Sequence, residues 1–174
     1  MGEVVLYIAA SVDGFIARKD GDVSWLEKFN EGGEDYGYKE FYRGIGASIM
    51  GSHTYVQAVG FGQWDKKMPT YVITKRKLEK LPGAKIEFYS GDLGSLVGRL
   101  KKETAKDIWL VGGGRLAQSF LDAGLVDRII LSVIPVLLGE GIPLFAMKGK
   151  ERELRLIGSK SYETGIVQMD FKVE

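Results

Sequence analysis

The 174-residue sequence has no cysteine and only one histidine, His53. The absence of cysteine excludes disulfide scaffolds, thiolate metal sites and a cysteine nucleophile. One histidine cannot build a multi-histidine metal centre within a single chain. We therefore expect no metal site and no chemistry that depends on a thiol.

An excess of one charge and a long apolar run are also missing. The 24 basic and 23 acidic residues leave a formal charge of +1, so no long-range field attracts nucleic acid or an anionic membrane. Residues 129–138 form the longest apolar run, which is far below the ~20 residues of a membrane-spanning helix. Glu3 stands where a secretory signal would carry a basic residue. We expect a cytoplasmic protein that binds a small molecule and neither nucleic acid nor membrane.

Glycine, in contrast, is abundant. The chain has 24 glycines, about twice the usual share, and they cluster at residues 32–33, 112–114 and 139–141. Only glycine lets the main chain approach a ligand closely or adopt a positive φ without strain. The clusters are candidate ligand-binding bends, although tight turns account for most of the individual glycines.

Hydrophobic periodicity predicts strands that alternate with helices. Val4–Ser11 is a continuous apolar run of strand length, typical of a strand buried on both faces. Tyr38, Phe41, Tyr42 and Ile45 recur at helical spacing and predict a helix. Further strands are predicted at residues 47–50, 69–74, 85–89, 107–111, 128–138, 153–162 and 166–173. Further helices are predicted from His53 with Ser52 as a candidate N-cap, behind Ser90 and Asp92 as candidate caps, and after Gly114.

This order predicts one α/β domain over residues 1–174. Its sheet should be mostly parallel, with a C-terminal antiparallel hairpin that turns at residues 164–165. Sheets of this kind bind ligands at the carboxyl ends of their strands. The loops after Ser11, Met50, Thr74 and Val111 are expected to lie together on that edge.

The strongest local signal is IWLVGGGR (residues 108–115), a strand that runs through three glycines into a helix. The first turn of a helix has free N–H groups and a partial positive charge, which favour phosphate. Neither the G-x-G-x-x-G nor the G-x-x-x-x-G-K-[ST] fingerprint is present. The segment is either a nucleotide-binding bend or a plain tight turn.

Four segments together resemble a known family. VGGGRLAQSFL (residues 111–121) resembles the cofactor segment of dihydrofolate reductase, and IAASVDGFIA (8–17), IMGSHTY (49–55) and VITKR (72–76) agree in the same order. IPVLLGEGIPLF (134–145) is closer to a sister branch, the C-terminal reductase domain of bifunctional riboflavin-biosynthesis enzymes and its stand-alone relatives. The resemblance covers nearly the whole chain. It implies a three-layer α/β/α fold with a mixed, mostly parallel sheet, and a nicotinamide cofactor.

The resemblance implies NADPH as the cofactor, with NADH as the alternative. Ala9 and Ala10 would offer backbone groups to the nicotinamide carboxamide, and Ile16 would pack on its ring. The pyrophosphate would be held by Gly112, Gly113, Gly114 and Arg115, with a cis peptide bond between two of the glycines. The phosphates and the adenosine side would be lined by Gly51, Ser52, His53, Thr54, Thr74, Lys75, Arg76, Val111 and Leu116.

Lys75 and Arg76 occupy positions that would read the 2′-phosphate of NADPH. Dihydrofolate reductases often carry arginine where this chain has Ser52. The preference for NADPH over NADH therefore depends on Arg76 and its neighbours.

Reduction of a C=N bond takes a hydride from the cofactor and a proton from another source. The resemblance places the acidic residue of the family at Asp35, whereas a helical wheel places Glu34 closer to the apolar stripe. We assign Asp35 as catalytic and Glu34 as the alternative, and therefore as a substrate-binding candidate. Two acids that merely stabilise a helix N-terminus would give the same pattern.

Two further residues are candidates for binding the substrate. Lys39 stands where the folate-reducing branch has an aromatic residue, and a lysine suits an anionic group such as a ribose phosphate. An exposed ion pair between Lys39 and Asp35 is the alternative. Ser132 matches a hydroxyl position that touches the substrate in the family.

The resemblance implies an NADPH-dependent reductase of the 5-amino-6-(5-phosphoribosylamino)uracil type, which acts on a small pyrimidine or pterin-like substrate. Dihydrofolate reductase activity is the alternative among enzymes, and Lys39 argues against it. A non-catalytic NADPH-binding module and an interaction domain that keeps only the fold are alternatives of other classes. Related domains suggest a homodimer, formed through residues 128–138.

Overall fold

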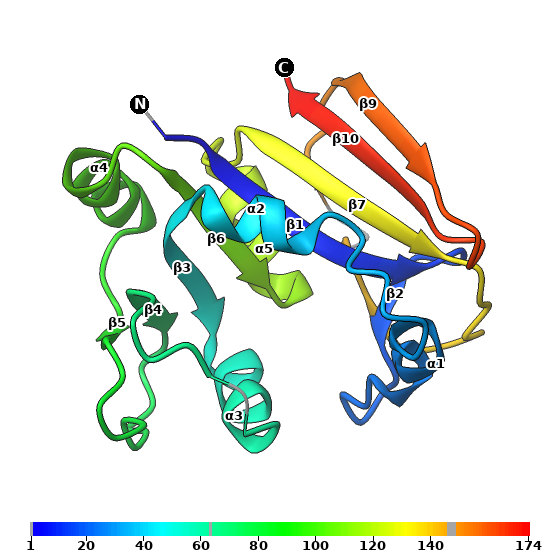
Figure 1. Ribbon diagram of the computed structural model, residues 1–174. Helices are drawn as coiled ribbons and strands as arrows, with labels where there is room; N and C mark the ends of the chain where they lie inside the picture. The colour runs from blue at the N-terminus through cyan, green and yellow to red at the C-terminus, as the bar shows by residue number, and fades with distance from the viewer. Residues whose placement is uncertain (1, 63, 146–148) are drawn as a thin grey trace.

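The computed structural model describes residues 2–62, 64–145 and 149–174, and an eight-stranded sheet forms its centre (Figure 1). The strand order across the sheet is β5-β4-β3-β6-β1-β7-β10-β9. The strands are β1 (Val4–Ser11), β3 (Ile45–Gly51), β4 (Thr70–Ile73), β5 (Ile86–Tyr89), β6 (Asp107–Gly112), β7 (Arg128–Ile134), β9 (Leu154–Ser161) and β10 (Val167–Val173). The helices are α1 (Glu27–Asn30), α2 (Tyr38–Arg43), α3 (Ser52–Gly60), α4 (Leu93–Glu103) and α5 (Gly114–Asp122).

The pairing of the strands confirms a mixed, mostly parallel sheet. The strands from β5 to β7 are parallel to their neighbours, and β10 is antiparallel to both β7 and β9. β1 lies at the middle with a parallel partner on each side, which explains why its sequence is apolar along nearly its whole length. The C-terminal antiparallel hairpin is formed by β9 and β10.

Helices cover both faces of the sheet. Leu6 and Ile108 point to one face and pack with Leu96 of α4 and Phe120 of α5 in the main core cluster. Tyr7 points to the other face, where its ring stacks on Phe41 of α2 with 4.4 Å between the ring centroids. Figure 1 shows α2 in front of the sheet and α5 behind it. The predicted three-layer α/β/α arrangement is confirmed.

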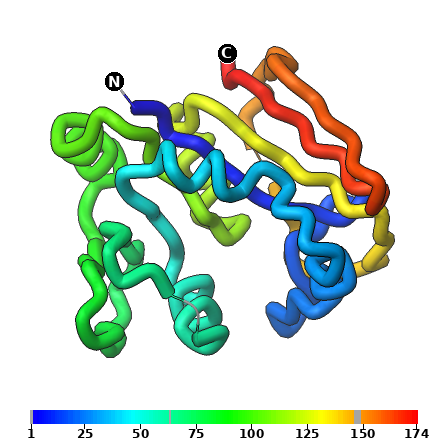
Figure 2. Tube along the Cα trace, viewed as in Figure 1, coloured from blue at the N-terminus to red at the C-terminus, as the bar shows by residue number. Residues whose placement is uncertain are grey.

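The parallel pairing brings the carboxyl ends of β1, β3, β4 and β6 to one edge of the sheet. α3 begins directly after β3, and α5 begins two residues after β6. Both chain termini lie at the upper edge of the view in Figure 2, while α3 lies at the lower edge. The edge that carries the candidate loops is thus remote from the chain ends.

A small second sheet connects two loops near this edge. β2 (Phe15–Ala17) pairs with β8 (Ile142–Pro143). The Asp13 carboxylate accepts hydrogen bonds from the backbone N–H groups of Leu138 (3.1 Å) and Gly139 (2.7 Å). These contacts hold the loop after β1 against the loop after β7.

Three predicted element boundaries were wrong. α2 ends at Arg43, and Ile45 already belongs to β3. α3 includes Ser52 and has Gly51 as its N-cap, so Ser52 does not cap it. β7 ends at Ile134 instead of residue 138, because Pro135 has no N–H to continue the ladder.

The homodimer through residues 128–138 stays a prediction, but its geometry is restricted. β7 is paired along both edges within the chain, so a second copy cannot extend the sheet there. The open edge beyond the C-terminal hairpin is β9. None of the helices in the described part of the chain has the length and apolar character needed to cross a bilayer.

Gly114 gives the first testable prediction. A Cβ built on this residue would lie 2.5 Å from the carbonyl oxygen of Pro143, and backbone cannot yield as a flexible side chain can. Gly114→Ala is therefore expected to lower the free energy of unfolding by about 1–3 kcal/mol. Urea denaturation followed by circular dichroism measures the change.

Gly98 provides the matched control, because it is exposed in α4 and a Cβ there would meet no described atom within 4 Å. Gly98→Ala is expected to raise stability by about 0.5–1 kcal/mol, since alanine is the better helix former. Equal effects of the two substitutions would contradict the close packing of α5 against residues 142–145.

Candidate active site

Two helix N-termini meet at the carboxyl edge of the sheet. α3 follows Gly51 and α5 follows Gly113, and neither cap residue has a side chain to satisfy the first N–H groups of its helix. β3 and β6 are neighbours, with Met50 in register with Gly112. Free N–H groups and partial positive charge from two helices therefore face one place, which favours an anion such as a phosphate.

The bend at Gly112 and Gly113 has a backbone shape that demands glycine. Gly112 has φ +105°, and the peptide bond that follows it is cis, as the resemblance implied. A Cβ on Gly112 would lie 3.4 Å from Cδ1 of Ile8, so the bend packs closely against β1. The N–H of Gly113 donates to Oγ1 of Thr54 at 3.1 Å, which ties the bend to the first turn of α3.

The predicted cofactor residues gather along the same edge. Lys75 and Arg76 follow β4, the neighbour of β3, and both are exposed. The N–H of Arg76 donates to Oγ1 of Thr74 at 2.9 Å, which fixes the turn that carries these basic residues. The structure places Gly51, Ser52, His53, Thr54, Thr74, Lys75, Arg76, Val111, Gly112, Gly113, Gly114, Arg115 and Leu116 at the ends of β3, β4 and β6 or in the first turns of α3 and α5. Ala9 and Ala10 lie in β1, and Ile16 lies in β2.

A cavity of about 340 Å³ opens on the face of the sheet that α2 covers. It is lined by Tyr7, Ala9, Leu26, Phe29, Asn30, Glu34, Asp35, Tyr36, Tyr38, Lys39, Ser132, Ile134 and Ile166. The set contains all four residues predicted to act on or bind the substrate. It also contains Ala9, which the resemblance placed beside the nicotinamide, so the cavity adjoins the predicted cofactor site.

Asp35 lines this cavity and lies in the segment that leads into α2. Its carboxylate accepts hydrogen bonds from the backbone N–H groups of Gly37 (3.1 Å) and Lys39 (3.2 Å). These two bonds, the one from Lys39 foremost, hold the pKa of the Asp35 carboxyl below its usual value. Asp35 is therefore ionised at neutral pH and acts as a hydrogen-bond acceptor.

The helical wheel for Glu34 and Asp35 was wrong, because α2 begins only at Tyr38. Gly37 adopts φ +77° and Tyr36 φ +52°, so the chain turns sharply before the helix starts. Glu34 is exposed, and its carboxylate accepts from the N–H of Tyr36 at 3.0 Å. Both acids stabilise the turn into α2, and both also line the cavity.

Tyr7 is a cavity residue that the sequence did not single out. It lies within the apolar run of β1, and the sequence pattern there predicts only a core residue. Alternation along the strand, with Tyr7 and Ala9 on the same face, is the signal that could have found it. Burial raises the pKa of the Tyr7 phenol above its usual value, so the hydroxyl stays protonated over the physiological range.

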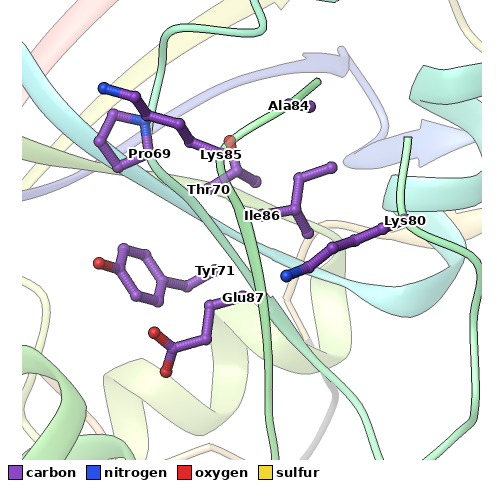
Figure 3. Close-up of a pocket in the computed structure, with 8 residues that line it drawn as sticks. All are labelled: Pro69, Thr70, Tyr71, Lys80, Ala84, Lys85, Ile86 and Glu87. Atoms are coloured by element: carbon purple, nitrogen blue, oxygen red, sulfur yellow. The ribbon is translucent and has the colours of Figure 1, made fainter. Parts of the chain in front are cut away.

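A second cavity, also of about 340 Å³, lies at the start of β4 and β5 (Figure 3). Its lining includes Thr70, Tyr71, Lys80, Lys85 and Glu87, and it contains none of the predicted site residues. It lies at the amino ends of these strands, away from the edge that carries the glycine bend. Among the residues that the structure describes, no group of three or more His, Asp or Glu side chains could hold a metal.

The fold is that of a dihydrofolate-reductase-like α/β domain. The model of the RibD C-terminal domain family matches residues 3–168, and the chain belongs to this family, which is a riboflavin-pathway-like reductase family.

The relatives show how far the similarity extends. The uncharacterized protein YwjB of Bacillus subtilis (strain 168) is 38% identical over 164 residues, 92% of each chain. The riboflavin biosynthesis protein RibD of Corynebacterium ammoniagenes is 27% identical over 157 residues, which cover 82% of this chain and 46% of RibD. A solved structure from Shewanella sp. PV-4, named for riboflavin biosynthesis, superposes with a TM-score of 0.89 at 26% identity and covers 99% of each chain.

Proposed function

We propose that the protein is an NADPH-dependent reductase of 5-amino-6-(5-phosphoribosylamino)uracil or a closely similar pyrimidine. The observation that carries the proposal is the cavity that gathers Asp35, Lys39 and Ser132 and shares Ala9 with the predicted cofactor site. We also propose that residues 1–174 form one reductase domain, since β1 and β10, from opposite ends of the chain, belong to the same sheet.

The residues at the sheet edge fit a dinucleotide with an extra phosphate. The backbone N–H groups at the start of α5 and the Thr54 hydroxyl would hold the pyrophosphate, and Lys75 and Arg76 would hold the 2′-phosphate. Ala9 and Ala10 would align the nicotinamide at the cavity. When bound, the reduced nicotinamide supplies a hydride to the substrate carbon of a C=N bond.

The ionised Asp35 is the group that organises proton delivery. A carboxylate with a lowered pKa accepts hydrogen bonds, so Asp35 would hold a water molecule or a substrate N–H at the reacting nitrogen. The proton that this nitrogen gains would come from that water, which would regain a proton from the solvent. Fixing donor and acceptor in reach of each other is the main contribution that a protein makes to such a step.

Lys39 would set the substrate class. Its backbone N–H donates to the Asp35 carboxylate, and both residues line the cavity. An ammonium group there would attract the phosphate of a phosphoribosyl substrate, whereas the alternative, dihydrofolate, places an uncharged ring in the pocket.

The direct test follows NADPH absorbance while the protein is mixed with 5-amino-6-(5-phosphoribosylamino)uracil or, separately, with dihydrofolate. We expect oxidation of NADPH with the phosphoribosyl pyrimidine and little with dihydrofolate. Turnover of dihydrofolate alone would replace the proposal with the folate activity. NADPH binding without turnover of either compound would support the non-catalytic module.

A further inference from the structure

Three neighbouring strands place Ala9, Ser132 and Gln168 in one row across the sheet. Ser132 of β7 is in register with Ala9 of β1 on one side and with Gln168 of β10 on the other. Ala9 and Ser132 line the cavity, and Gln168 lies one strand further from β1. Gln168 is half-buried and lies within hydrogen-bond distance of the cavity wall.

The amide nitrogen of Gln168 meets three oxygen atoms. Nε2 lies 3.0 Å from Oγ of Ser132, 3.3 Å from the hydroxyl of Tyr7 and 3.2 Å from the carbonyl oxygen of Tyr36. A carbonyl oxygen can only accept hydrogen bonds, so the contact with Tyr36 fixes the orientation of the amide with its nitrogen toward the cluster. Gln168 is therefore a donor to all three partners, which share its two N–H hydrogens.

The donor role of Gln168 determines what Ser132 offers to a ligand. Because Oγ of Ser132 accepts a hydrogen from Gln168, its own hydrogen is left to point elsewhere, and the side chain borders the cavity. Ser132 is 8% exposed, so its hydroxyl has little access to bulk water. A ligand acceptor atom that reaches Ser132 can receive this hydrogen.

The same amide also holds the turn that carries Asp35. Tyr36 follows Asp35 directly, and its carbonyl group is anchored to the sheet by Gln168. The ring of Tyr36 packs edge-on against Tyr162, with 5.0 Å between the centroids. One side chain thus connects the position of the catalytic candidate with the orientation of Ser132.

We propose that Gln168 is a positioning residue that presents the Ser132 hydroxyl as a hydrogen-bond donor to a carbonyl or hydroxyl oxygen of the substrate. The proposal rests on the proposed function for the identity of the substrate. For the hydrogen bond to the substrate, Gln168 acts through Ser132, so its removal weakens that bond only while the Ser132 hydroxyl is present.

A double-mutant cycle tests this dependence without turnover. The dissociation constant of 5-amino-6-(5-phosphoribosylamino)uracil is measured by calorimetry in the presence of NADP⁺, which cannot reduce it. The proteins are the wild type, Ser132→Ala, Gln168→Leu and the double variant. Each single variant is expected to weaken binding about 10-fold, and the double variant is expected to be no weaker than Ser132→Ala. Gln168→Glu keeps the side-chain length but replaces the donor with an acceptor, and we expect the same loss.

Unchanged binding in Gln168→Leu and Gln168→Glu, or losses that multiply in the double variant, would overturn the proposal. The affinity for NADPH is the reference measurement, because a variant that disturbs the fold would also bind NADPH more weakly. We expect all variants to bind NADPH as tightly as the wild type. A parallel fall in NADPH affinity would mean that Gln168 supports the fold rather than Ser132.

A second readout separates this proposal from the proposed function. Gln168 donates to the Tyr7 hydroxyl and so stabilises the ionised phenol, and Gln168→Leu is expected to raise the Tyr7 pKa. Ultraviolet titration, with Tyr7→Phe as the reference, measures this without any substrate. An unchanged Tyr7 pKa would refute the donor assignment, while failure of the wild type to bind the pyrimidine would refute only the proposed function.

Discussion

Asp35→Asn is expected to lower kcat for the pyrimidine substrate by about 10²–10⁴-fold, the usual contribution of a positioned acid–base group. The amide keeps the size of the carboxylate and can still accept a hydrogen bond from the N–H of Lys39 or Gly37. The turn into α2 should therefore persist, while the charge that orders the proton-carrying water is lost. Initial rates of NADPH oxidation measure the effect, and calorimetry should find NADPH affinity unchanged.

Glu34→Gln is the matched control, since it makes the same chemical change one residue earlier in the same cavity wall. Glu34 is exposed, and its carboxylate accepts a hydrogen bond within the turn. We therefore expect the kcat of the Glu34→Gln variant to stay within about threefold of the wild-type value, in line with a role in the turn alone. Equal losses in the two variants would contradict the assignment to Asp35. A loss in Glu34→Gln alone would transfer the role to Glu34.

Arg76→Ala is expected to weaken NADPH binding by about 10–100-fold. A hydrogen bond to a charged group contributes about 1.5–3 kcal/mol, and the 2′-phosphate would lose such a partner. NADH has no 2′-phosphate, so its affinity should be nearly the same in the wild type and in the variant. Fluorescence titration of the reduced nicotinamide with both cofactors measures the two dissociation constants.

Lys80→Ala removes the same charge at the other end of the neighbouring strands, where Lys80 lines the second cavity (Figure 3). This variant controls for a general effect of the protein's net charge on the binding of an anionic ligand. We expect its affinities for NADPH and for NADH to equal those of the wild type. If Arg76→Ala weakened NADPH and NADH equally, Arg76 would not read the 2′-phosphate. If Lys80→Ala weakened NADPH as much, the phosphate would lie elsewhere.

The sequence was sufficient to predict those features of the fold that depend on local chemistry. The apolar run of β1 was predicted with its correct ends, because burial on both faces needs a continuous apolar sequence. Ser90 and Asp92 were the candidate caps of α4, and the Asp92 carboxylate is the one that accepts from the N–H of Ser95 at 2.7 Å. The bend at residues 112–114 was predicted because close backbone packing there requires glycine.

The features that sequence reasoning missed depend on contacts between distant segments. Ile45 continued the helical spacing of Phe41 and Tyr42, yet it faces the core as the first residue of β3. The turn that takes Asp35 out of the helix depends on φ values that no apolar pattern reports. Gln168 reaches Ser132 and Tyr7 only through the register of β10 against β7, which the tail alone could not reveal.

The proposed function predicts one pose for the dinucleotide, between the glycine bend and the cavity that Asp35 lines. A crystal structure of the protein grown with NADPH tests that pose most directly. We predict that the pyrophosphate lies within hydrogen-bond distance of the backbone N–H groups at Gly114 and Arg115, with the nicotinamide beside Ala9 and its reactive carbon facing the cavity that Asp35 lines. A dinucleotide bound in the second cavity beside Tyr71, or crystals in which saturating NADPH leaves the bend at residues 112–114 without ligand, would contradict it.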